Sequence, residues 1–179
     1  MTPATYCARE QLRDGRPIDM RALRPTDEAG MLDAINHTNA ESLRRRFFVT
    51  KRGFSEKEKS FFMNVDFVNH VALVAEIDED GQRKIIGGGR YVVSAPSEAE
   101  VAFVVIDAYQ GQGIGTLLTR HLSVIARAAG LKELVADVLP ENAPMQKVLR
   151  KFGFEALRGK DPQVVHYALA LQSPSRNKV

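Results

Sequence analysis

The chain has 179 residues, 44% of them hydrophobic, which favours one domain able to bury roughly 70% of its unfolded surface. The net charge of +3, from 25 basic and 22 acidic residues, is too even to indicate a nucleic-acid partner. No run approaches the roughly twenty apolar residues of a membrane span, and the polar N-terminus is unlike a secretory signal. The single cysteine, Cys7, excludes an internal disulfide and a cysteine-based zinc site, so we expect a cytoplasmic protein.

The hydrophobic pattern predicts alternating strands and helices between residues 17 and 172. A loosely attached arm, residues 1–16, is expected before them and a frayed tail, residues 173–179, after them. The predicted strands are 18–23, 71–77, 84–93, 100–106, 134–139, 155–157 and 164–171. Predicted helices begin near Thr26 or Asp27, at Ser55 with a Ser55–Glu58 capping box, at Thr116 and at Ala143, and residues 42–48 add a helical turn. We therefore expect one α/β (α+β) domain with a mixed sheet of six to seven strands and about four helices.

The most informative segment is 107–116, which reads DAYQGQGIGT. It follows the apolar strand expected at 100–106 and leads directly into an amphipathic helix. Gly111, Gly113 and Gly115 leave the backbone N–H groups of this turn unobstructed, and a helix N-terminus adds about half a positive charge. Such a turn is a binding site for an anionic phosphate group.

Two common phosphate motifs do not fit this segment. A P-loop requires four residues between its glycines and then Lys with Ser or Thr, but no lysine stands beside Thr116. A dinucleotide-binding fingerprint has the spacing Gly-x-Gly-x-x-Gly, whereas the spacing here is Gly-x-Gly-x-Gly. A glycine-rich turn without a ligand remains the alternative interpretation.

Residues 110–115 resemble the Gln/Arg-x-x-Gly-x-Gly/Ala loop of the GCN5-related N-acetyltransferases (the GNAT family), which holds the pyrophosphate of coenzyme A. Downstream, Asn142, a short helix and Gly153-Phe154 also match that family. Residues 99–103 and 107–115 are most similar to the acetyltransferase domain of bacterial protein lysine acetyltransferases. The resemblance spans roughly residues 18–171 and implies the GNAT fold. The sequence contains no cyclic-nucleotide-binding or synthetase domain, so we expect no allosteric control by such a domain.

The resemblance also implies the residues that bind acetyl-CoA. The loop and the start of the next helix would hold the diphosphate, the backbone of the preceding strand would bind the pantetheine arm, and the short helix would flank the cofactor. The expected cofactor-binding residues are Phe103, Val104, Val105, Gln110, Gly111, Gln112, Gly113, Ile114, Gly115, Thr116, Asn142 and Arg150. Asn142 also suits an ordinary helix N-cap. No metal is expected, because His, Asp and Glu do not cluster at metal-ligand spacing.

Acetyl transfer to an amine requires the amine to be neutral. A free lysine, with a pKa near 10.4, is only about one part in a thousand neutral at pH 7.4, and a positioned base recovers about 10²- to 10⁴-fold in rate. Glu100, at the start of the strand that leads to the glycine loop, is the expected general base, and the resemblance supports this choice. A solvent-exposed glutamate at a strand start is the alternative, and Asp137 and Glu141 are rival carboxylates.

Other polar positions receive structural interpretations. Leu149 stands where many small-amine members of the family have a tyrosine general acid, so the coenzyme A thiolate, from a thiol of pKa about 8.5, would leave without it. We interpret His70 as capping a strand, His121 as packing against the sheet and His166 as a core or edge residue.

We therefore expect an acetyl-CoA-dependent N-acetyltransferase in which the amine attacks the thioester directly. The expected acceptor is a protein lysine, for example on an acyl-CoA synthetase, with no nucleic acid or membrane as partner. The alternatives are a small amine or amino acid as acceptor, and a non-catalytic module that senses coenzyme A. A protein acceptor predicts an open cleft near Glu100, whereas a small amine predicts a closed pocket with a counter-charge.

Overall fold

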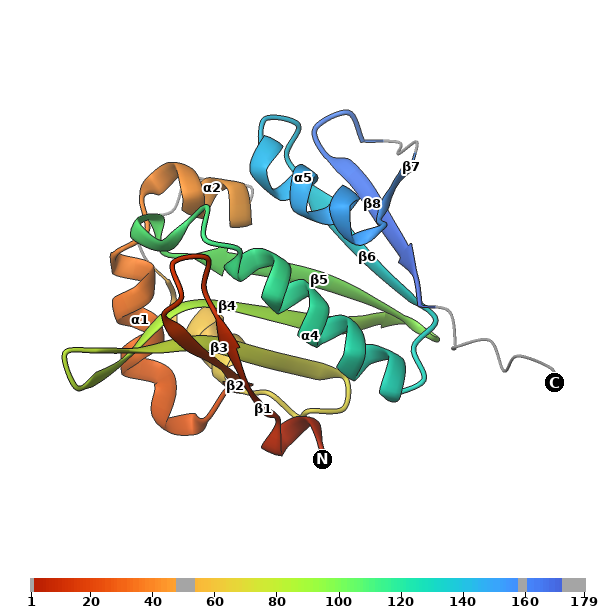
Figure 1. The fold of residues 1–179 in the computed structure, drawn as a ribbon. Helices are drawn as coiled ribbons and strands as arrows, with labels where there is room; N and C mark the ends of the chain where they lie inside the picture. The colour runs from red at the N-terminus through yellow and green to blue at the C-terminus, as the bar shows by residue number, and fades with distance from the viewer. Residues whose placement is uncertain (1, 48–53, 158–160, 172–179) are drawn as a thin grey trace, which may run out of the picture.

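The computed structural model describes residues 2–47, 54–157 and 161–171 (Figure 1). The strands are β1 (Cys7–Gln11), β2 (Pro17–Ala22), β3 (His70–Glu79), β4 (Gln82–Ala95), β5 (Glu98–Val105), β6 (Glu133–Val138), β7 (Glu155–Leu157) and β8 (Val165–Ala170). The α-helices are α1 (Glu28–Asn36), α2 (Ala40–Phe47), α3 (Glu56–Met63), α4 (Ile114–Ala128) and α5 (Ala143–Phe152). Short 3₁₀ helices are η1 (Pro3–Thr5), η2 (Pro25–Asp27) and η3 (Asp107–Tyr109).

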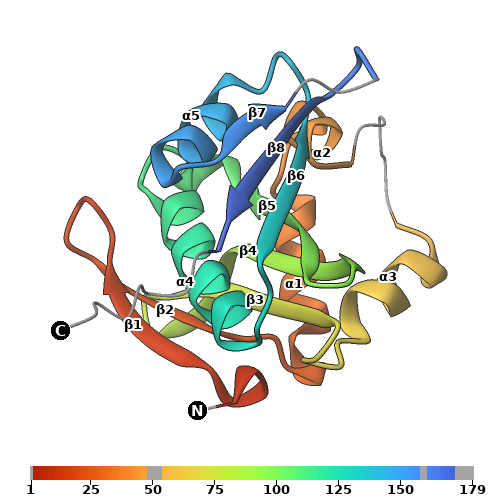
Figure 2. The ribbon, with the colours of Figure 1, turned by 90° about the vertical axis from the view of Figure 1, so that its right-hand side faces the viewer.

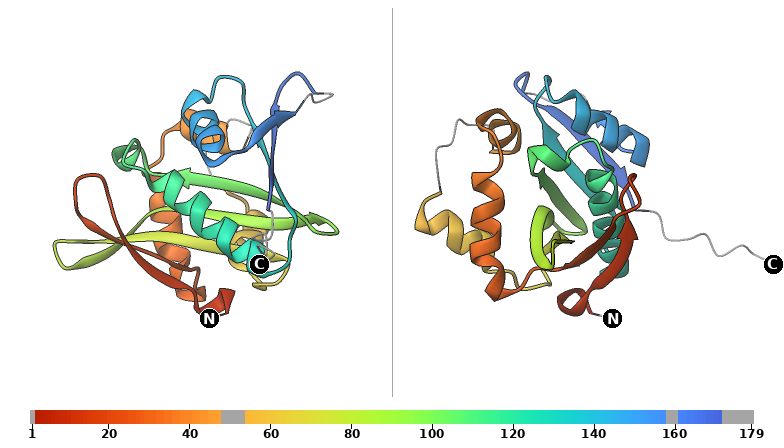
Figure 3. Two further views of the ribbon diagram at one scale, coloured as in Figure 1. Left: turned by 45° about the vertical axis from the view of Figure 1, so that its right-hand side comes forward. Right: turned by 60° about the vertical axis from the view of Figure 1, so that its left-hand side comes forward.

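The eight described strands form one mixed sheet in the order β1-β2-β3-β4-β5-β6-β8-β7. All neighbouring strands are antiparallel except β5 and β6, which are parallel. Helices α4 and α5 lie on one face of the sheet, and α1, α2 and α3 lie on the other (Figures 2 and 3). The predicted mixed α/β fold is confirmed, with one strand more than the upper number expected.

Helix α4 covers the middle of the sheet with an apolar face. Leu118, Leu122 and Ile125 recur at helical spacing and are buried. A Cβ added to Gly89 in β4 would lie 2.8 Å from the Phe103 ring and 3.1 Å from Leu122. Glycine at this position therefore allows the Phe103 ring and α4 to pack closely on the strand.

The first sixteen residues are not a loose arm along their whole length. Strand β1 pairs with β2 from Cys7↔Arg21 to Gln11↔Pro17 and forms one edge of the sheet. In addition, Tyr6 Oη lies 2.5 Å from Nδ1 of His121, whose buried position on α4 agrees with its predicted packing role. The predicted C-terminal tail lies outside the described residues, and the domain limits at 17 and 172 remain a prediction.

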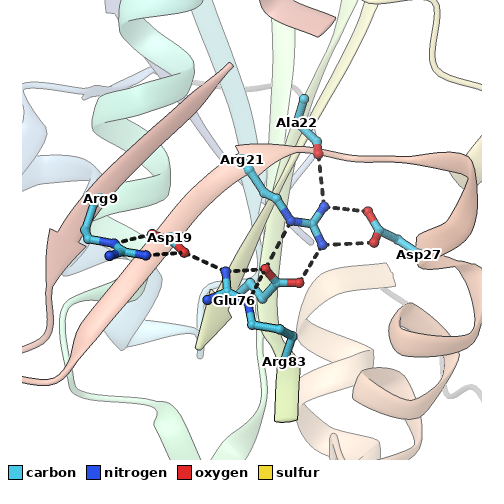
Figure 4. Close-up of polar contacts among 7 residues, drawn as sticks. All are labelled: Arg9, Asp19, Arg21, Ala22, Asp27, Glu76 and Arg83. Atoms are coloured by element: carbon cyan, nitrogen blue, oxygen red, sulfur yellow. Dashed lines mark hydrogen bonds and ion pairs between the residues drawn. The ribbon is translucent and has the colours of Figure 1, made fainter. Parts of the chain in front are cut away.

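A network of charges, with four buried members and two exposed arginines (Arg9 and Arg83), joins β1–β4 to η2 (Figure 4). Its members are Arg9, Asp19, Arg21, Asp27, Glu76 and Arg83. Arg21, which is buried, lies 2.7 Å from Asp27 and 2.6 Å from Glu76. Because each of these carboxylates is paired with an arginine, its burial does not leave an uncompensated charge.

Lowering the pH should weaken this network, because it protonates the Asp19 carboxylate. Hydrogen bonds from Arg9 lower the pKa of Asp19 to about 2, against the opposing effect of burial, and those from Arg83 add to the effect. Because this pKa lies below the unfolded value of 3.8, the ionised carboxylate stabilises the fold above about pH 4, and its contribution is lost as the pH falls through about 2. We expect urea titrations to show that Asp19 accounts for a loss of about 2 kcal/mol in the free energy of unfolding between pH 4.5 and 2. The Asp19→Asn variant should lack this part of the pH dependence, and an identical pH dependence would contradict the assignment.

Candidate active site

The glycine loop connects β5 to α4, as the sequence predicts. Gly111 and Gly113 have φ angles of 77° and 94°, in the left-handed region that favours glycine. Gly113 is the N-cap of α4, and the first helical hydrogen bond runs from Leu117 N to Gly113 O at 3.0 Å. Three N–H groups therefore precede any intrahelical bond and are available to an anion. They belong to Ile114, Gly115 and Thr116.

Two side chains of the loop support it from within. Nε2 of Gln110 donates to the Val105 carbonyl at 3.1 Å and to Oδ1 of Asp107 at 3.0 Å. Asp107 also accepts hydrogen bonds from the Asn39 N–H at 2.6 Å and the Ser42 hydroxyl at 2.7 Å, which attach α2 to the loop. We therefore expect Gln110 to contribute to the cofactor site by supporting the loop. The role of Asp107 in attaching α2 was not foreseen, because Asn39 and Ser42 are more than sixty residues away in the chain.

Helix α5 lies beside the start of α4. A Cβ added to Gly115 would lie 3.9 Å from the side chain of Val148. The predicted N-cap is confirmed, because Asn142 Oδ1 accepts a hydrogen bond from Met145 N at 3.3 Å. Arg150 is exposed in the last turn of α5, so Asn142 and Arg150 lie at opposite ends of this helix.

Beyond its first three residues, β5 has an unpaired edge. Parallel pairing with β6 ends at Glu100↔Val135, after which the two strands diverge (Figure 1). Ile106 N donates to Ile86 O of β4, and peptide groups alternate in direction along a strand. The peptide groups of Val104 therefore point towards β4, whereas those of Phe103 and Val105 point into the gap that β6 leaves. This edge can accept an extended chain that carries amide groups.

Glu100 stands where the two strands separate. Its side chain projects to the sheet face that carries α1–α3, and it is exposed. Among the residues that the structure describes, the Glu100 carboxylate has no hydrogen-bond or ion-pair partner. Partial desolvation raises its pKa, the negative charge of Asp137 adds to this effect, and the positive charge of Arg46 opposes it. A carboxylate of this kind is free to take up a proton.

The two rival carboxylates are already engaged. Glu141 forms an ion pair with Arg44 of α2, and its pKa is lowered by a backbone hydrogen bond and by that arginine. Asp137 binds Nδ1 of His166 at 2.5 Å. Both are therefore less suited than Glu100 to act as the base. Leu149, at the position of the family's tyrosine, is fully buried and offers no acid group.

An apolar cavity of about 60 Å³ lies between α1–α3 and the sheet. Ala102 and Val104 form part of its floor, and Arg46, Phe62 and Arg90 form part of its wall. Burial lowers the pKa of Arg46 to about 10 and that of Arg90 to about 9, and the charge of Arg46 contributes to the shift at Arg90. The cavity therefore brings two cationic groups to the face on which Glu100 projects.

Arg90 also holds the neighbouring histidine. It donates to the Phe62 carbonyl at 3.2 Å, and its guanidinium lies 2.9 Å from Nε2 of His70. Burial and the charge of Arg90 both lower the pKa of His70. This buried histidine begins β3, in agreement with its predicted position at a strand end.

Two arginines that sequence analysis did not connect to the site lie against the loop. They come from the tip of the β1–β2 hairpin, which reaches the start of α4 (Figure 3). Arg13 donates to the Gly111 carbonyl at 2.9 Å, and Arg16 donates to Gln112 Oε1 at 3.3 Å. The guanidinium of Arg16 also lies 5.5 Å from the centre of the Tyr109 ring. A sequence pattern does not reveal contacts between residues that are nearly a hundred positions apart.

Within residues 2–47, 54–157 and 161–171, no group of three or more His, Cys, Asp or Glu side chains could hold a metal ion. Over the same ranges, no helix is long and apolar enough to cross a membrane.

A glycine loop at a helix N-terminus, beside a sheet that splits between two parallel strands, defines a coenzyme A-dependent acyltransferase. The chain belongs to the acetyltransferase (GNAT) family, whose model matches residues 37–154. It is an N-acetyltransferase with acetyl-CoA as the donor.

Sequence and structure comparisons agree with this membership. The acetyltransferase PA5475 of Pseudomonas aeruginosa is 30% identical over 160 residues, which cover 88% of this chain and 86% of that protein. The acetyltransferase Pat of Mycolicibacterium smegmatis is 31% identical over 145 residues, which cover 80% of this chain but only 43% of Pat. The crystal structure of the GNAT domain of S. lividans PAT has 32% identity and a TM-score of 0.85, and covers 92% of this chain and 96% of that domain.

Removing Arg13 should weaken donor binding. A cation beside a phosphate site attracts the phosphates of acetyl-CoA, so we expect Arg13→Ala to raise the dissociation constant of acetyl-CoA about three- to tenfold, as measured by calorimetry at low salt. Arg127→Ala is the matched control, because it removes an exposed arginine in the last turn of α4. Equal affinities for the Arg13 and Arg127 variants would show that the hairpin does not assist binding.

Proposed function

We propose that the protein transfers an acetyl group from acetyl-CoA to the side-chain amine of a protein lysine, with Glu100 as the general base. The observation that carries this proposal is the position of Glu100, which is exposed where β5 and β6 separate and has no hydrogen-bond or ion-pair partner in the described parts of the chain. The glycine loop lies at the far end of the same strand, roughly 20 Å away for six extended residues. A cofactor that spans this edge would have its diphosphate at one end and its thioester near Glu100.

The donor would be bound mainly by backbone groups. The N–H groups of Ile114, Gly115 and Thr116 suit the diphosphate, and the peptide groups of Phe103 and the N–H of Val105 suit the amides of the pantetheine arm. Gly111, Gln112 and Gly113 shape the loop, while Gln110 supports it. The backbone of Val104 was also expected to bind this arm, but its peptide groups face β4 instead. On this proposal Asn142 and Arg150 flank the cofactor from α5.

The chemistry requires little from the protein beyond positioning and one proton acceptor. Glu100 takes a proton from the acceptor ammonium, and the neutral nitrogen attacks the thioester carbon. The carbon–sulfur bond then breaks, the coenzyme A thiolate leaves with the electron pair, and the nitrogen, which became cationic on attack, releases its second proton to water to give the neutral amide. Because a thiol of pKa about 8.5 is a tolerable leaving group, a tyrosine at the position of Leu149 is not essential. Positioning the two reactants can supply about 7–11 kcal/mol of the barrier.

Two observations support a protein as acceptor. The chain is similar to Pat of M. smegmatis over 145 residues and to the S. lividans PAT domain over 92% of its length. In addition, the Glu100 side chain is exposed and can be reached by a lysine on another molecule. An acyl-CoA synthetase is the partner that the resemblance to protein lysine acetyltransferases suggests.

One observation favours a second candidate. The cavity beneath α1–α3 is lined in part by Arg46 and Arg90, which is the counter-charge expected for a small acceptor with an anionic group. An amino acid whose amine reaches Glu100 while its carboxylate approaches these arginines would fit this arrangement.

Mass spectrometry can separate the two candidates. Cellular proteins and a pool of amines and amino acids would be incubated in parallel with isotope-labelled acetyl-CoA and either the enzyme or its Glu100→Gln variant. A protein acceptor predicts labelled lysines that require active enzyme. If the label instead accumulates in amino acids and the proteins stay unlabelled, the protein-acceptor proposal is wrong. If neither pool is labelled, acetyl transfer itself is not supported.

A further inference from the structure

Asp137 and His166 form a pair beside Glu100 that the reaction described above does not use. The register of the strands places this pair close to Glu100. Glu100 is opposite Val135 in β6, and Asp137 lies two residues further along β6, opposite His166 in β8. Since side chains alternate between faces along a strand, Glu100, Val135, Asp137 and His166 project to the same face. The two carboxylates therefore flank the point at which β5 and β6 separate.

The geometry of the pair leaves one side of Asp137 open. His166 Nδ1 lies 2.5 Å from Oδ1 of Asp137, which fixes the orientation of the carboxylate. The other oxygen, Oδ2, has no hydrogen-bond partner within the described part of the chain. The Asp137 and His166 side chains are 37% and 33% exposed, so a ligand can reach them. Asp137 is thus a carboxylate that His166 holds in one orientation, with one oxygen available. It lies next to Glu100, which has no partner within the described residues.

The other charged groups around this point come from three elements. Arg46 of α2 lies close enough to Glu100 to oppose the increase in its pKa. Arg44 of α2 and Glu141, after β6, form an ion pair with each other. On β5 itself, Glu98 accepts a hydrogen bond from the Ser94 hydroxyl at 2.6 Å. Glu100 and the outer oxygen of Asp137 flank the separation of β5 and β6 and, within the described residues, remain available to a cation.

We infer that Asp137, oriented by His166, binds the ammonium form of the acceptor amine together with Glu100. This inference rests on the proposed function, and it assigns a cationic alkylamine as the group recognised, whether on a protein or on a small molecule. An amine of pKa near 10.4 arrives almost entirely protonated at neutral pH, so two carboxylates attract the form that is present. Glu100 then takes one proton, and Asp137 keeps the nitrogen in place beside the thioester.

The test compares the kinetics of Asp137→Asn with those of the wild type. We expect the KM for the acceptor to rise about tenfold, while the KM for acetyl-CoA and the thermal midpoint stay close to wild type. The acid limb of kcat/KM for the acceptor reports the pKa of the base in the free enzyme. Because the negative charge of Asp137 raises the pKa of Glu100, its removal should move this limb to lower pH. Glu133→Gln is the matched control, since it removes a carboxylate from the same face of β6 at the opposite end of the strand.

His166 variants provide a second test that does not change the two carboxylates. His166→Ala should raise the acceptor KM about threefold, because Asp137 loses its orienting hydrogen bond. His166→Asn, which retains a donor near the position of Nδ1, should restore most of the affinity. If Ala and Asn behave alike, orientation by His166 is excluded.

The outcomes separate this inference from the proposed function. If Asp137→Asn has the wild-type acceptor KM and acid limb while Glu100→Gln is inactive, the inference is wrong and the proposed base stands. If Glu100→Gln keeps full activity, the proposed base is wrong, and the inference that Glu100 and Asp137 together bind the ammonium group is wrong as well. If Asp137→Asn does not fold, the two His166 variants test the inference in its place.

Discussion

Replacing Glu100 by Gln is expected to lower turnover by about 10²- to 10⁴-fold while leaving the affinity for acetyl-CoA nearly unchanged. The substitution keeps the size and shape of the side chain but removes the proton acceptor. Because Glu100 has no hydrogen-bond or ion-pair partner within the described residues, this change should not break an interaction of the fold. Steady-state kinetics with a saturating acceptor, together with calorimetry of acetyl-CoA binding, measure the two effects.

The pH dependence sharpens this prediction. Without a base, the reaction depends on the fraction of amine that is already neutral, so the rate of Glu100→Gln should rise about tenfold per pH unit until the pH approaches the amine pKa of about 10.4. The wild-type rate should instead level off above the pKa of Glu100, which is raised by desolvation and by Asp137. Glu98→Gln, on the same strand and face, is the control and should keep both the rate and its plateau. Wild-type turnover in Glu100→Gln would show that another group, or water, takes the proton.

Local sequence signals predicted much of the fold. The Ser55–Glu58 capping box begins α3, and Asn142 begins α5, whose last residue, Phe152, precedes Gly153 as expected. These features depend on interactions within a few residues of each other, which sequence pattern records directly. The glycine loop belongs to the same class, because its φ angles are a local requirement.

Features that depend on tertiary packing were missed. Strand β1 carries two consecutive charged residues, Arg9 and Glu10, and lies at a sheet edge, so it lacks the apolar pattern of an internal strand. The Asp137–His166 pair depends on the register of β6 against β8, which the sequence of neither strand specifies alone. The contacts of Arg13 and Arg16 with the loop depend on where a hairpin tip folds across the molecule. Interactions between distant segments thus complete the site around a locally encoded loop.

Replacing Gly113 by Glu should lower the affinity for acetyl-CoA at least 100-fold, or about 2.7 kcal/mol in binding free energy. Gly113 has a φ of 94° at the N-terminus of α4, where an added side chain carries a backbone penalty of about 1–2 kcal/mol. The new carboxylate would also repel the diphosphate and compete for the same N–H groups and for Arg13. A Cβ at this position would meet Nε of Arg13 at 3.8 Å, an ordinary contact, so the substitution should not clash with the fold.

Two alanine variants separate backbone strain from loss of the anion site. Gly113→Ala carries the same strain without the negative charge, and we expect it to weaken acetyl-CoA binding only a few-fold. Gly130, just beyond the end of α4, has a φ of 82° and open space around it, so Gly130→Ala should lose similar stability without any effect on binding. Calorimetry and thermal unfolding of all three variants give affinity and stability together. If Gly113→Glu binds acetyl-CoA as tightly as Gly113→Ala does, negative charge at this turn does not oppose the ligand, and the diphosphate must bind elsewhere.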